Sequence, residues 1–424
     1  MDKNSQTIFT VPMQLKKDIS IGNLYDFLIA DFYWKGRIIQ WNNIHNPLVL
    51  NINWNKTQEL LKLNGYWTID RDKIEPFIQE CKAKILTSLK SYWITFSWVI
   101  RDDVIKEELN DLLAQNFPEE WKIDEIYINS CSSCTASFWT DFSVDLCKYC
   151  WSKTIKKISR EFFQKIDYDI LYEKAEKINW MPEYSKSKFL DFLKKMPESY
   201  DLTLSKSREF TLSYKDFLLD PRYIAILTIL LDKQSVKTNK TTIIHGDVLK
   251  KYDYYLLCHL KQDDLPETIV SHWIITDAQR QKVKRSPSSA KWSESWYSHK
   301  AIRCILLKND IFKGIKFDES NMDKQVKEAT KYYLKITQMI KPWIIRKDIS
   351  SLDWRLSEDR KEFIIALNNF RFGKCFVLFT KMVDFLRNIT KNTWLNSFEH
   401  EILSNLLLLY YWENGNWTQN EFEQ

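Results

Sequence analysis

Short apolar runs alternate with amphipathic stretches through the first 115 residues of the chain. Runs at 6–12 and 47–53, rich in β-branched and other apolar side chains, predict buried strands. Apolar residues at helical spacing predict helices at 24–32, 72–91 and 104–115. Strands that alternate with helices in this way predict an α/β fold with a parallel sheet.

The pattern changes in the later part of the chain. We expect helices within 155–196, strands at 222–232 and 241–245, and a further apolar segment at 267–275. From about residue 323 onward, apolar positions recur at three- and four-residue intervals, which predicts helices only. The chain is therefore expected to be a parallel-sheet domain followed by an α-helical bundle.

Four cysteines form two C-x-x-C pairs, Cys131 with Cys134 and Cys147 with Cys150, separated by twelve residues. Four thiolates brought together are the tetrahedral ligand set that structural Zn²⁺ prefers. A redox role is the weaker interpretation, because no thioredoxin-like βαβ context surrounds the pairs. The other alternative is four cysteines that are buried separately in the core, and it would require this spacing to have arisen by chance. The segment interrupts the α/β pattern, so we expect a zinc knuckle within an insertion.

The composition is that of a globular protein with a mild excess of positive charge. The net charge of +6 is compatible with an anionic partner such as RNA without requiring one. The longest apolar runs, 223–231 and 406–412, are far shorter than a membrane span. Residues 1–7 are polar and do not resemble a signal peptide, so we expect a cytoplasmic protein with reduced cysteines.

Two short segments have the composition of nucleotide-binding elements. Residues 20–23 (Ser-Ile-Gly-Asn) stand between a strand and a helix, where backbone N–H groups and the positive helix end can face a phosphate. An ordinary Ser N-cap would give the same pattern. The loop at 280–291 is rich in serine and cations and contains residues 282–286 (Lys-Val-Lys-Arg-Ser). By itself this loop also fits a solvated surface segment.

The order of these segments resembles that of class I aminoacyl-tRNA synthetases, which carry an H-I-G-H motif near the N-terminus and K-M-S-K-S late in the catalytic domain. Residues 20–23 match the first motif and 282–286 the second, and 301–307 match the A-L-R-Y-x-L-L segment that follows. Within the class, a small zinc knuckle between the motifs is typical of methionyl-tRNA synthetases. The interval 127–240 is too short for the editing domain of the leucyl, isoleucyl and valyl enzymes.

The resemblance implies an enzyme that uses ATP and Mg²⁺ to activate methionine as an aminoacyl-adenylate and then transfers it to tRNA(Met). Fixed donors and cations must meet the charge that develops on the α-phosphate and the leaving pyrophosphate. The matching residues are, for catalysis, Ser20, Asn23, Lys282 and Arg285; for ATP, Ser20, Gly22, Asn23, Asp247, Lys282, Lys284, Arg285 and Ser286; for the amino acid, Asn55; and for tRNA, Trp394. The Zn²⁺ would be structural.

Departures from the family pattern leave other functions open. Ser20 and Asn23 replace both histidines of the first motif, and Asn55 replaces an aspartate that holds the substrate ammonium group. One alternative is a degenerate synthetase-like protein that binds tRNA or nucleotide without catalysis. Others are a leucyl, isoleucyl or valyl type of synthetase, or an unrelated zinc-ribbon scaffold. The sequence does not determine the oligomeric state.

The resemblance divides the chain into four segments. Residues 1–105 and 166–318 would form the two halves of a Rossmann-like catalytic domain, the second ending in a stem-contact segment. Residues 106–165 would be a connective insertion with the zinc knuckle, and 319–424 an α-helical, anticodon-binding-like domain.

Glycine and tryptophan have unusual frequencies. A glycine content of about 7% would give roughly 30 residues in a chain of this length, whereas the sequence has 7 glycines and 18 tryptophans. Trp93, Trp151 and Trp273 fall where the resemblance predicts glycine, at positions whose backbone conformation is expected to favour it. We therefore interpret many of the tryptophans as UGA codons that the source organism reads as glycine.

Overall fold

The computed structural model describes most of the chain, and the structural statements below refer to that part. The described residues are 5–15, 19–40, 43–52, 60–61, 64–66, 71–116, 121–133, 137–139, 145–147, 151–165, 167–195, 199–201, 213–214, 217–218, 221–236, 238, 240–247, 250–273, 275–276, 298–316, 322–339, 354–390, 395 and 397–411.

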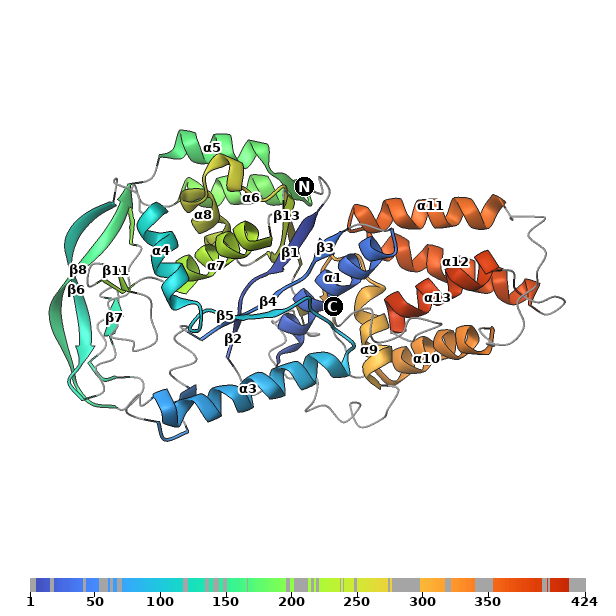
Figure 1. The fold of residues 1–424 in the computed structure, drawn as a ribbon, viewed down its shortest axis with the longest axis horizontal. Helices are drawn as coiled ribbons and strands as arrows, with labels where there is room; N and C mark the ends of the chain where they lie inside the picture. The colour runs from blue at the N-terminus through green and yellow to red at the C-terminus, as the bar shows by residue number, and fades with distance from the viewer. Residues whose placement is uncertain are drawn as a thin grey trace.

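A five-stranded sheet forms the centre of the molecule (Figure 1). Its strands lie in the order β3–β1–β13–β14–β9, and every neighbouring pair is parallel. They are β3 (Ile44–His45), β1 (Gln6–Thr10), β13 (Lys240–Gly246), β14 (Thr268–His272) and β9 (Asn179–Met181). The predicted parallel-sheet α/β class is confirmed.

Two prolines divide this sheet from a smaller one. β2 (Met13–Gln14), β4 (Leu48–Asn51) and β5 (Val99–Arg101) form a parallel sheet in that order. Pro12 lies between β1 and β2, and Pro47 lies between β3 and β4. Because proline has no N–H to donate to a strand ladder, each proline interrupts the pairing where the chain passes from one sheet to the other.

Alternate residues of each strand enter two different cores. Ile8, Ile244 and Val270 pack with α1 (Ile21–Ile38) and α3 (Arg71–Ser91). Their chain neighbours Phe9, Ile243 and Ile269 pack in a second core with the helices α4 (Lys106–Asn116), α5 (Tyr168–Lys177), α6 (Tyr184–Leu193), α7 (Pro221–Val236) and α8 (Lys250–His259). Both faces of the sheet are therefore covered, so successive side chains of its strands are buried on opposite faces.

Two predicted elements are wrong. Residues 222–232 lie in α7, which packs against α4 and α8, and do not form a strand. A run of leucine and isoleucine fits a buried helix as well as a buried strand, so only its packing distinguishes the two. A helix was expected from residue 155, but β8 (Thr154–Lys165) occupies the start of that segment. It pairs antiparallel with the whole of β6 (Trp121–Cys131).

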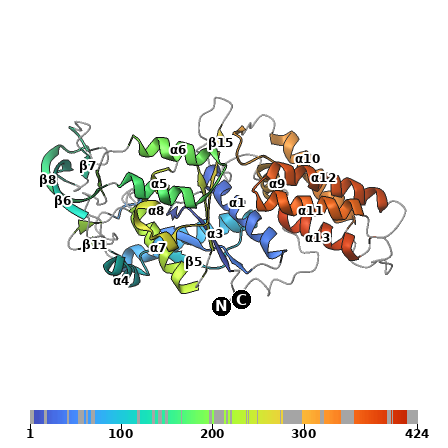
Figure 2. The same cartoon turned by 90° about the horizontal axis from the view of Figure 1, so that it is seen from above.

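The β6–β8 ribbon lies at the end of the molecule opposite the helical bundle (Figure 2). β7 (Ser137–Trp139) and β10 (Ser199–Asp201) flank it, so that the sheet has the order β10–β8–β6–β7. β6 follows α4 and β8 precedes α5, so the ribbon interrupts the α/β succession.

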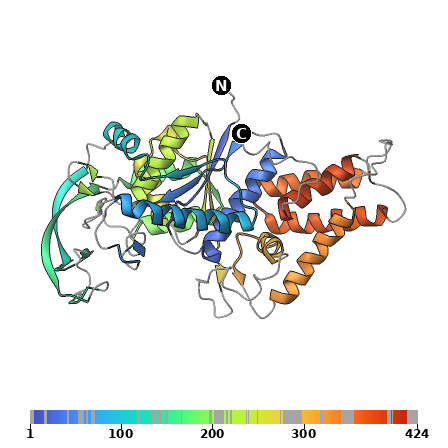
Figure 3. The same ribbon diagram turned by 60° about the horizontal axis from the view of Figure 1, so that its bottom comes forward.

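The helices α9 (Ser298–Leu307), α10 (Met322–Met339), α11 (Trp354–Asn368), α12 (Phe372–Ile389) and α13 (Ser397–Tyr411) form a bundle beside α1 (Figure 3). The helical pattern predicted from residue 323 is confirmed for the described residues. At Gly36 of α1, an added Cβ would lie 2.6 Å from the Leu367 methyl groups of α11, so a larger residue there would displace the Leu367 side chain. Among the described helices, none has the length and apolar character needed to cross a membrane.

A buried charge cluster ties α1 to the bundle. Asp31 of α1 accepts hydrogen bonds from Lys35 Nζ and from Arg303 Nη2 of α9, both at 2.6 Å. Arg303 also donates to the Leu409 carbonyl of α13 at 3.0 Å and to the Tyr92 carbonyl at 3.3 Å. Asp31, Lys35 and Arg303 are almost completely buried, so each charge depends on the others for solvation.

Trp93 occupies a glycine position at the end of α3. The Ile94 N–H donates to the Leu89 carbonyl at 3.2 Å, and the Trp93 N–H donates to the Lys90 carbonyl at 2.9 Å. These two bonds define a Schellman motif, whose left-handed residue is usually glycine. Trp93 is that residue, with φ 55°.

Trp151 also has a left-handed backbone, with φ 59°, and its side chain is 75% exposed. Phe370 shares this conformation, with φ 54°, but it is buried and stacks on Tyr33 with ring centroids 4.2 Å apart. Burial therefore offsets the strain at Phe370 but not at Trp151. Trp273 does not have a positive φ, so the expected glycine conformation is confirmed at Trp93 and Trp151 and is wrong at Trp273.

Replacement by glycine should change the free energy of unfolding in opposite directions at Trp93 and Trp151 and at ordinary buried tryptophans. Trp93→Gly and Trp151→Gly should each raise the free energy of unfolding by about 1 kcal/mol, because a left-handed backbone is strained for any residue with a Cβ. Trp34→Gly and Trp180→Gly are the controls and should lower it by about 3–5 kcal/mol. Both control side chains are buried, and their indoles donate to the carbonyls of Ile44 and Ala175 at 3.0 and 2.8 Å.

Chemical denaturation of the four variants measures these differences, and the gene gives an independent test. We expect UGA codons at 93 and 151 and UGG codons at 34 and 180. UGG at 93 and 151 would refute the coding interpretation, whatever the stability of the variants.

Candidate active site

The carboxyl ends of β13 and β14 form the edge at which parallel α/β sheets bind ligands. β13 ends at Gly246 and β14 at His272, and these two residues are paired in register. Asp247 follows directly, and its N–H donates to the His272 carbonyl at 2.8 Å. The structure thus places Asp247, assigned to ATP binding by resemblance, at this edge.

Helix α1 begins with Ser20 as its N-cap. The Ser20 hydroxyl accepts a hydrogen bond from the Asn23 N–H at 3.4 Å and donates to Asn23 Oδ1 at 2.8 Å. Ser20 and Asn23, both assigned to catalysis, are therefore held together with Gly22 in the same turn. The first turn contains no acidic residue, so no side chain there neutralises the positive end of the helix.

His272 connects α1 to the end of β14. Its Nε2 is hydrogen-bonded to the Asp26 carboxylate of α1, and its Nδ1 lies 3.0 Å from the Trp273 carbonyl. The Tyr25 ring and the imidazole form a T-shaped pair, with centroids 5.1 Å apart. These interactions bring the start of α1 and the ends of β13 and β14 into one site.

Tyr25 and His245 supply buried polar groups beneath this site. The Tyr25 hydroxyl has no hydrogen-bond partner among the described residues, and burial raises its pKa well above the ordinary value, so it stays protonated. His245 Nε2 lies 2.7 Å from Asp253. Burial alone would lower the pKa of His245, but the Asp253 carboxylate and its hydrogen bond raise the pKa above the ordinary value. His245 is therefore buried and held in place by Asp253, and it is not an exposed base.

The sequence analysis missed three residues that contact this edge. Asp26 and His272 form the pair described above, and Lys188 of α6 pairs with Asp247 at 2.9 Å. A histidine at the end of a buried strand was a visible signal for His272. Asp26 and Lys188 had no such signal, because each stands on an amphipathic helix where a charged side chain is ordinarily solvated.

Several residues assigned from the sequence lie outside the described part of the structure. They are Lys282, Lys284, Arg285 and Ser286 of the cationic loop, Asn55, Trp394, and the knuckle residues Cys134 and Cys150. Their roles stay predictions.

Two of the four knuckle cysteines, Cys131 and Cys147, lie in the described part of the structure. Cys131 and Cys147 are buried. The Ser133 N–H lies 3.4 Å from Cys131 Sγ, and the Trp151 N–H donates to the Cys147 carbonyl at 2.9 Å. An amide N–H directed at sulfur stabilises a thiolate. No group of three or more metal-binding side chains occurs among the residues that the structure describes.

Comparison with known proteins identifies the fold. No protein-family model and no curated protein matches the chain. Among solved structures, Mycobacterium tuberculosis methionyl-tRNA synthetase bound by methionyl-adenylate has a TM-score of 0.71 at 10% identity, covering 99% of this chain and 96% of that chain. The chain has the fold of methionyl-tRNA synthetase.

Two further structures of the same M. tuberculosis enzyme match this fold. A complex with methionyl-adenylate has a TM-score of 0.67 at 10% identity, covering 99% of this chain and 95% of that chain. The apo form has a TM-score of 0.63 at 10% identity, covering 97% of this chain and 90% of that chain. The methionyl-tRNA synthetase fold thus spans nearly the whole chain.

Proposed function

We propose that this chain is a class I aminoacyl-tRNA synthetase that activates methionine with ATP and transfers it to tRNA(Met). The agreement in fold over 99% of the chain is the main support. Ser20, Asn23 and Asp247 also lie at the sheet edge where such chemistry would occur. Within this proposal, residues 319–424 are the anticodon-binding domain and 106–165 the connective insertion.

Activation requires the α-phosphate to be held while the amino-acid carboxylate attacks it. Backbone N–H groups at the start of α1 and the Asn23 amide would donate to the phosphate oxygens. Asp247 would accept hydrogen bonds from the ribose. Lys282, Lys284 and Arg285 would neutralise the leaving pyrophosphate, with Ser286 beside them, and Mg²⁺ would accompany ATP. Asn55 would contact the amino acid.

One observation favours a second candidate, a synthetase-like protein that binds nucleotide or tRNA without catalysis. Ser20 and Asn23 are hydrogen-bonded to each other, and Ser20 also caps its helix. A short Ser side chain engaged in this way reaches less far toward a phosphate than the family's histidine.

Amino-acid-dependent exchange of pyrophosphate into ATP distinguishes these candidates. We expect exchange with methionine alone. Asn23→Ala should lower kcat/KM by about 100-fold, because it removes a donor that acts in the transition state. Asn369→Ala is the control, since Asn369 is exposed in the bundle and donates only locally to Ile365. Exchange with leucine, isoleucine or valine would change the assigned substrate, and none with any amino acid would favour the non-catalytic protein.

We further propose that Cys131, Cys134, Cys147 and Cys150 bind one structural Zn²⁺. The two described cysteines fit this role, because both are buried and one sulfur faces an amide N–H. With four protein ligands the ion has no open position for substrate, so it would stabilise the insertion and take no part in activation.

Metal analysis of the purified chain tests this site. We expect one zinc per chain, lost in Cys147→Ser and retained in Cys258→Ser, because Cys258 lies in α8 outside the knuckle. Chelation should lower the thermal stability of the protein while methionine-dependent exchange persists. A wild-type chain that neither contains nor takes up zinc would contradict the proposal.

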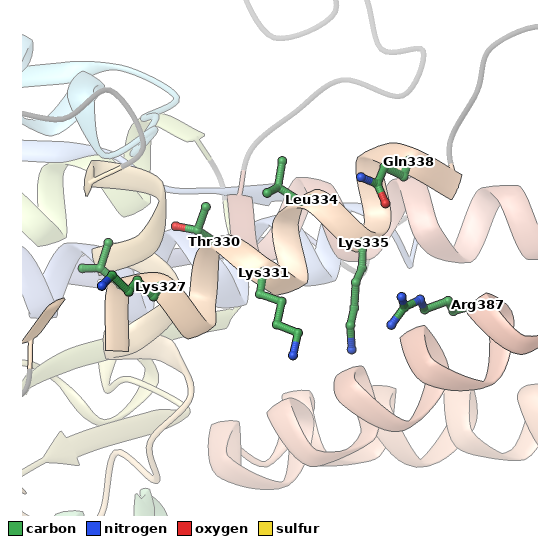
Figure 4. Close-up of a pocket in the computed structure, with 8 residues that line it drawn as sticks. Lys327, Thr330, Lys331, Leu334, Lys335, Gln338 and Arg387 are labelled. Atoms are coloured by element: carbon green, nitrogen blue, oxygen red, sulfur yellow. The ribbon is translucent and has the colours of Figure 1, made fainter. Parts of the chain in front are cut away.

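A cationic groove supports RNA as the partner of the bundle. It has a volume of about 480 Å³ and lies between α10 and α12, with Lys327, Lys331, Lys335 and Arg387 in its lining. Lys331, Lys335 and Arg387 point into the space between the two helices (Figure 4). One acid offsets this charge, since Asp384 pairs with Lys335 at 2.8 Å. A row of cations along one helix suits a phosphodiester backbone.

Binding of tRNA at increasing salt concentration tests the groove. The double variant Lys327→Gln/Lys331→Gln should bind more weakly, and the slope of log K against log salt should fall by about 0.7–0.9 for each phosphate that the variant no longer neutralises. Lys361→Gln/Lys374→Gln is the matched control, because these lysines pair with Glu358 and Glu362 outside the groove. Equal slopes for the two double variants would show that RNA does not use the groove.

A further inference from the structure

Lys188 lies where three neighbouring strands of the central sheet end. Its own helix, α6, follows β9. Its Nζ atom pairs with Asp247, which follows β13, at 2.9 Å. The same atom lies 4.7 Å from the centre of the Trp273 ring, which follows β14. Lys188 therefore lies at the carboxyl ends of the sheet, the edge at which ligands bind in this class of fold.

The surroundings of Lys188 differ from those of a surface lysine. Its Nζ also lies 4.7 Å from the centre of the Tyr184 ring, so two ring faces and a carboxylate surround one ammonium group. Tyr184 itself is held by a hydrogen bond to the Phe312 carbonyl at 3.3 Å. The cation–π contacts and the ion pair with Asp247 together hold the ammonium group in place. The interactions with Asp247 and Tyr184 remain if residue 273 is glycine.

Asp247 would oppose ATP binding if nothing neutralised it. A carboxylate can accept hydrogen bonds from ribose hydroxyls, but its negative charge repels a polyphosphate close by. Lys188 Nζ donates to Oδ2, and Ser271 Oγ lies 3.5 Å from Oδ1. Lys188 thus balances the charge of Asp247. The hydrogen bond from the Asp247 N–H to the His272 carbonyl fixes the position of Asp247.

We propose that Lys188 is a positioning residue for ATP, which holds Asp247 in place for the ribose and cancels its repulsion of the phosphates. This inference rests on the proposed function, since it assumes that ATP occupies the edge. Lys186 stands two residues away and pairs with Glu176 at 2.5 Å, and that acid is largely exposed. Lys186 is therefore the matched control, because it lies on the same helix as Lys188 but pairs with an exposed acid of α5, and such an ion pair contributes little to stability.

Direct measurement of the Kd for ATP by calorimetry, without amino acid, tests this role. Lys188→Met should raise the Kd about tenfold, as expected when one charge-assisted hydrogen bond is removed. Lys188→Arg should restore most of the affinity, and Lys186→Met should leave it unchanged. In the exchange assay, Lys188→Met should raise the KM for ATP with little change in kcat or in the KM for methionine.

The double variant Lys188→Met/Asp247→Asn separates charge balance from simple structural support. If Lys188 neutralises Asp247, removing the acid as well should return the Kd to within about threefold of the single variant Asp247→Asn. A structural lysine would instead give effects that add. Additive effects, or an unchanged Kd in Lys188→Met, would overturn the inference.

The same measurements separate this inference from the proposed function. ATP binding that weakens in Lys188→Met, in a protein with no exchange for any amino acid, would support Lys188 and reject catalysis. Exchange with methionine and a normal Kd in Lys188→Met would support catalysis and reject Lys188. A wild-type chain that binds no ATP would reject both.

Discussion

The packing of the sheet domain against the helical bundle depends on the buried Asp31 carboxylate. It is buried in α1 and satisfied by Lys35 of the same helix and Arg303 of α9. Burial lowers the pKa of Lys35 to about 7, although Asp31 acts in the opposite direction. Removing one member of such a group typically costs about 3–5 kcal/mol, because an unpaired charge is left in the core. That is a large fraction of the stability of a typical domain.

This cluster couples the bundle to the candidate active site through a single helix. Arg303 donates to the Leu409 carbonyl in the last turn of α13, so the position of α1 depends on how the bundle docks. Less than two turns before Asp31, the same helix presents Asp26 to His272 at the end of β14. The A-L-R-Y-like segment that suggested the family therefore has a structural role here, since its arginine joins the sheet domain to the bundle.

Trp93 and Trp151, which have a left-handed backbone, affect how the protein should be produced for experiments. Trp93 ends α3 beside the buried cluster, where its carbonyl accepts a hydrogen bond from Lys35 at 2.6 Å. Trp151 directly follows the second cysteine pair. A turn that needs a left-handed residue is strained by a Cβ in either place. A Cβ at position 93 therefore strains the turn that contacts Lys35, and a Cβ at position 151 strains the turn that contacts Cys147.

The sequence by itself determined the α/β class, the helical C-terminal part and the start of α1, because periodicity and capping are local properties. It misassigned residues 222–232 and 155–165, since a leucine-rich run and a charged amphipathic stretch each fit two structures until a partner is present. Only the tertiary structure brought Asp26 to His272 and Lys188 to Asp247, pairs separated by 246 and 59 residues. His272 had a local signal of its own, but neither pairing did, because chain topology alone decides which strand ends and helices meet.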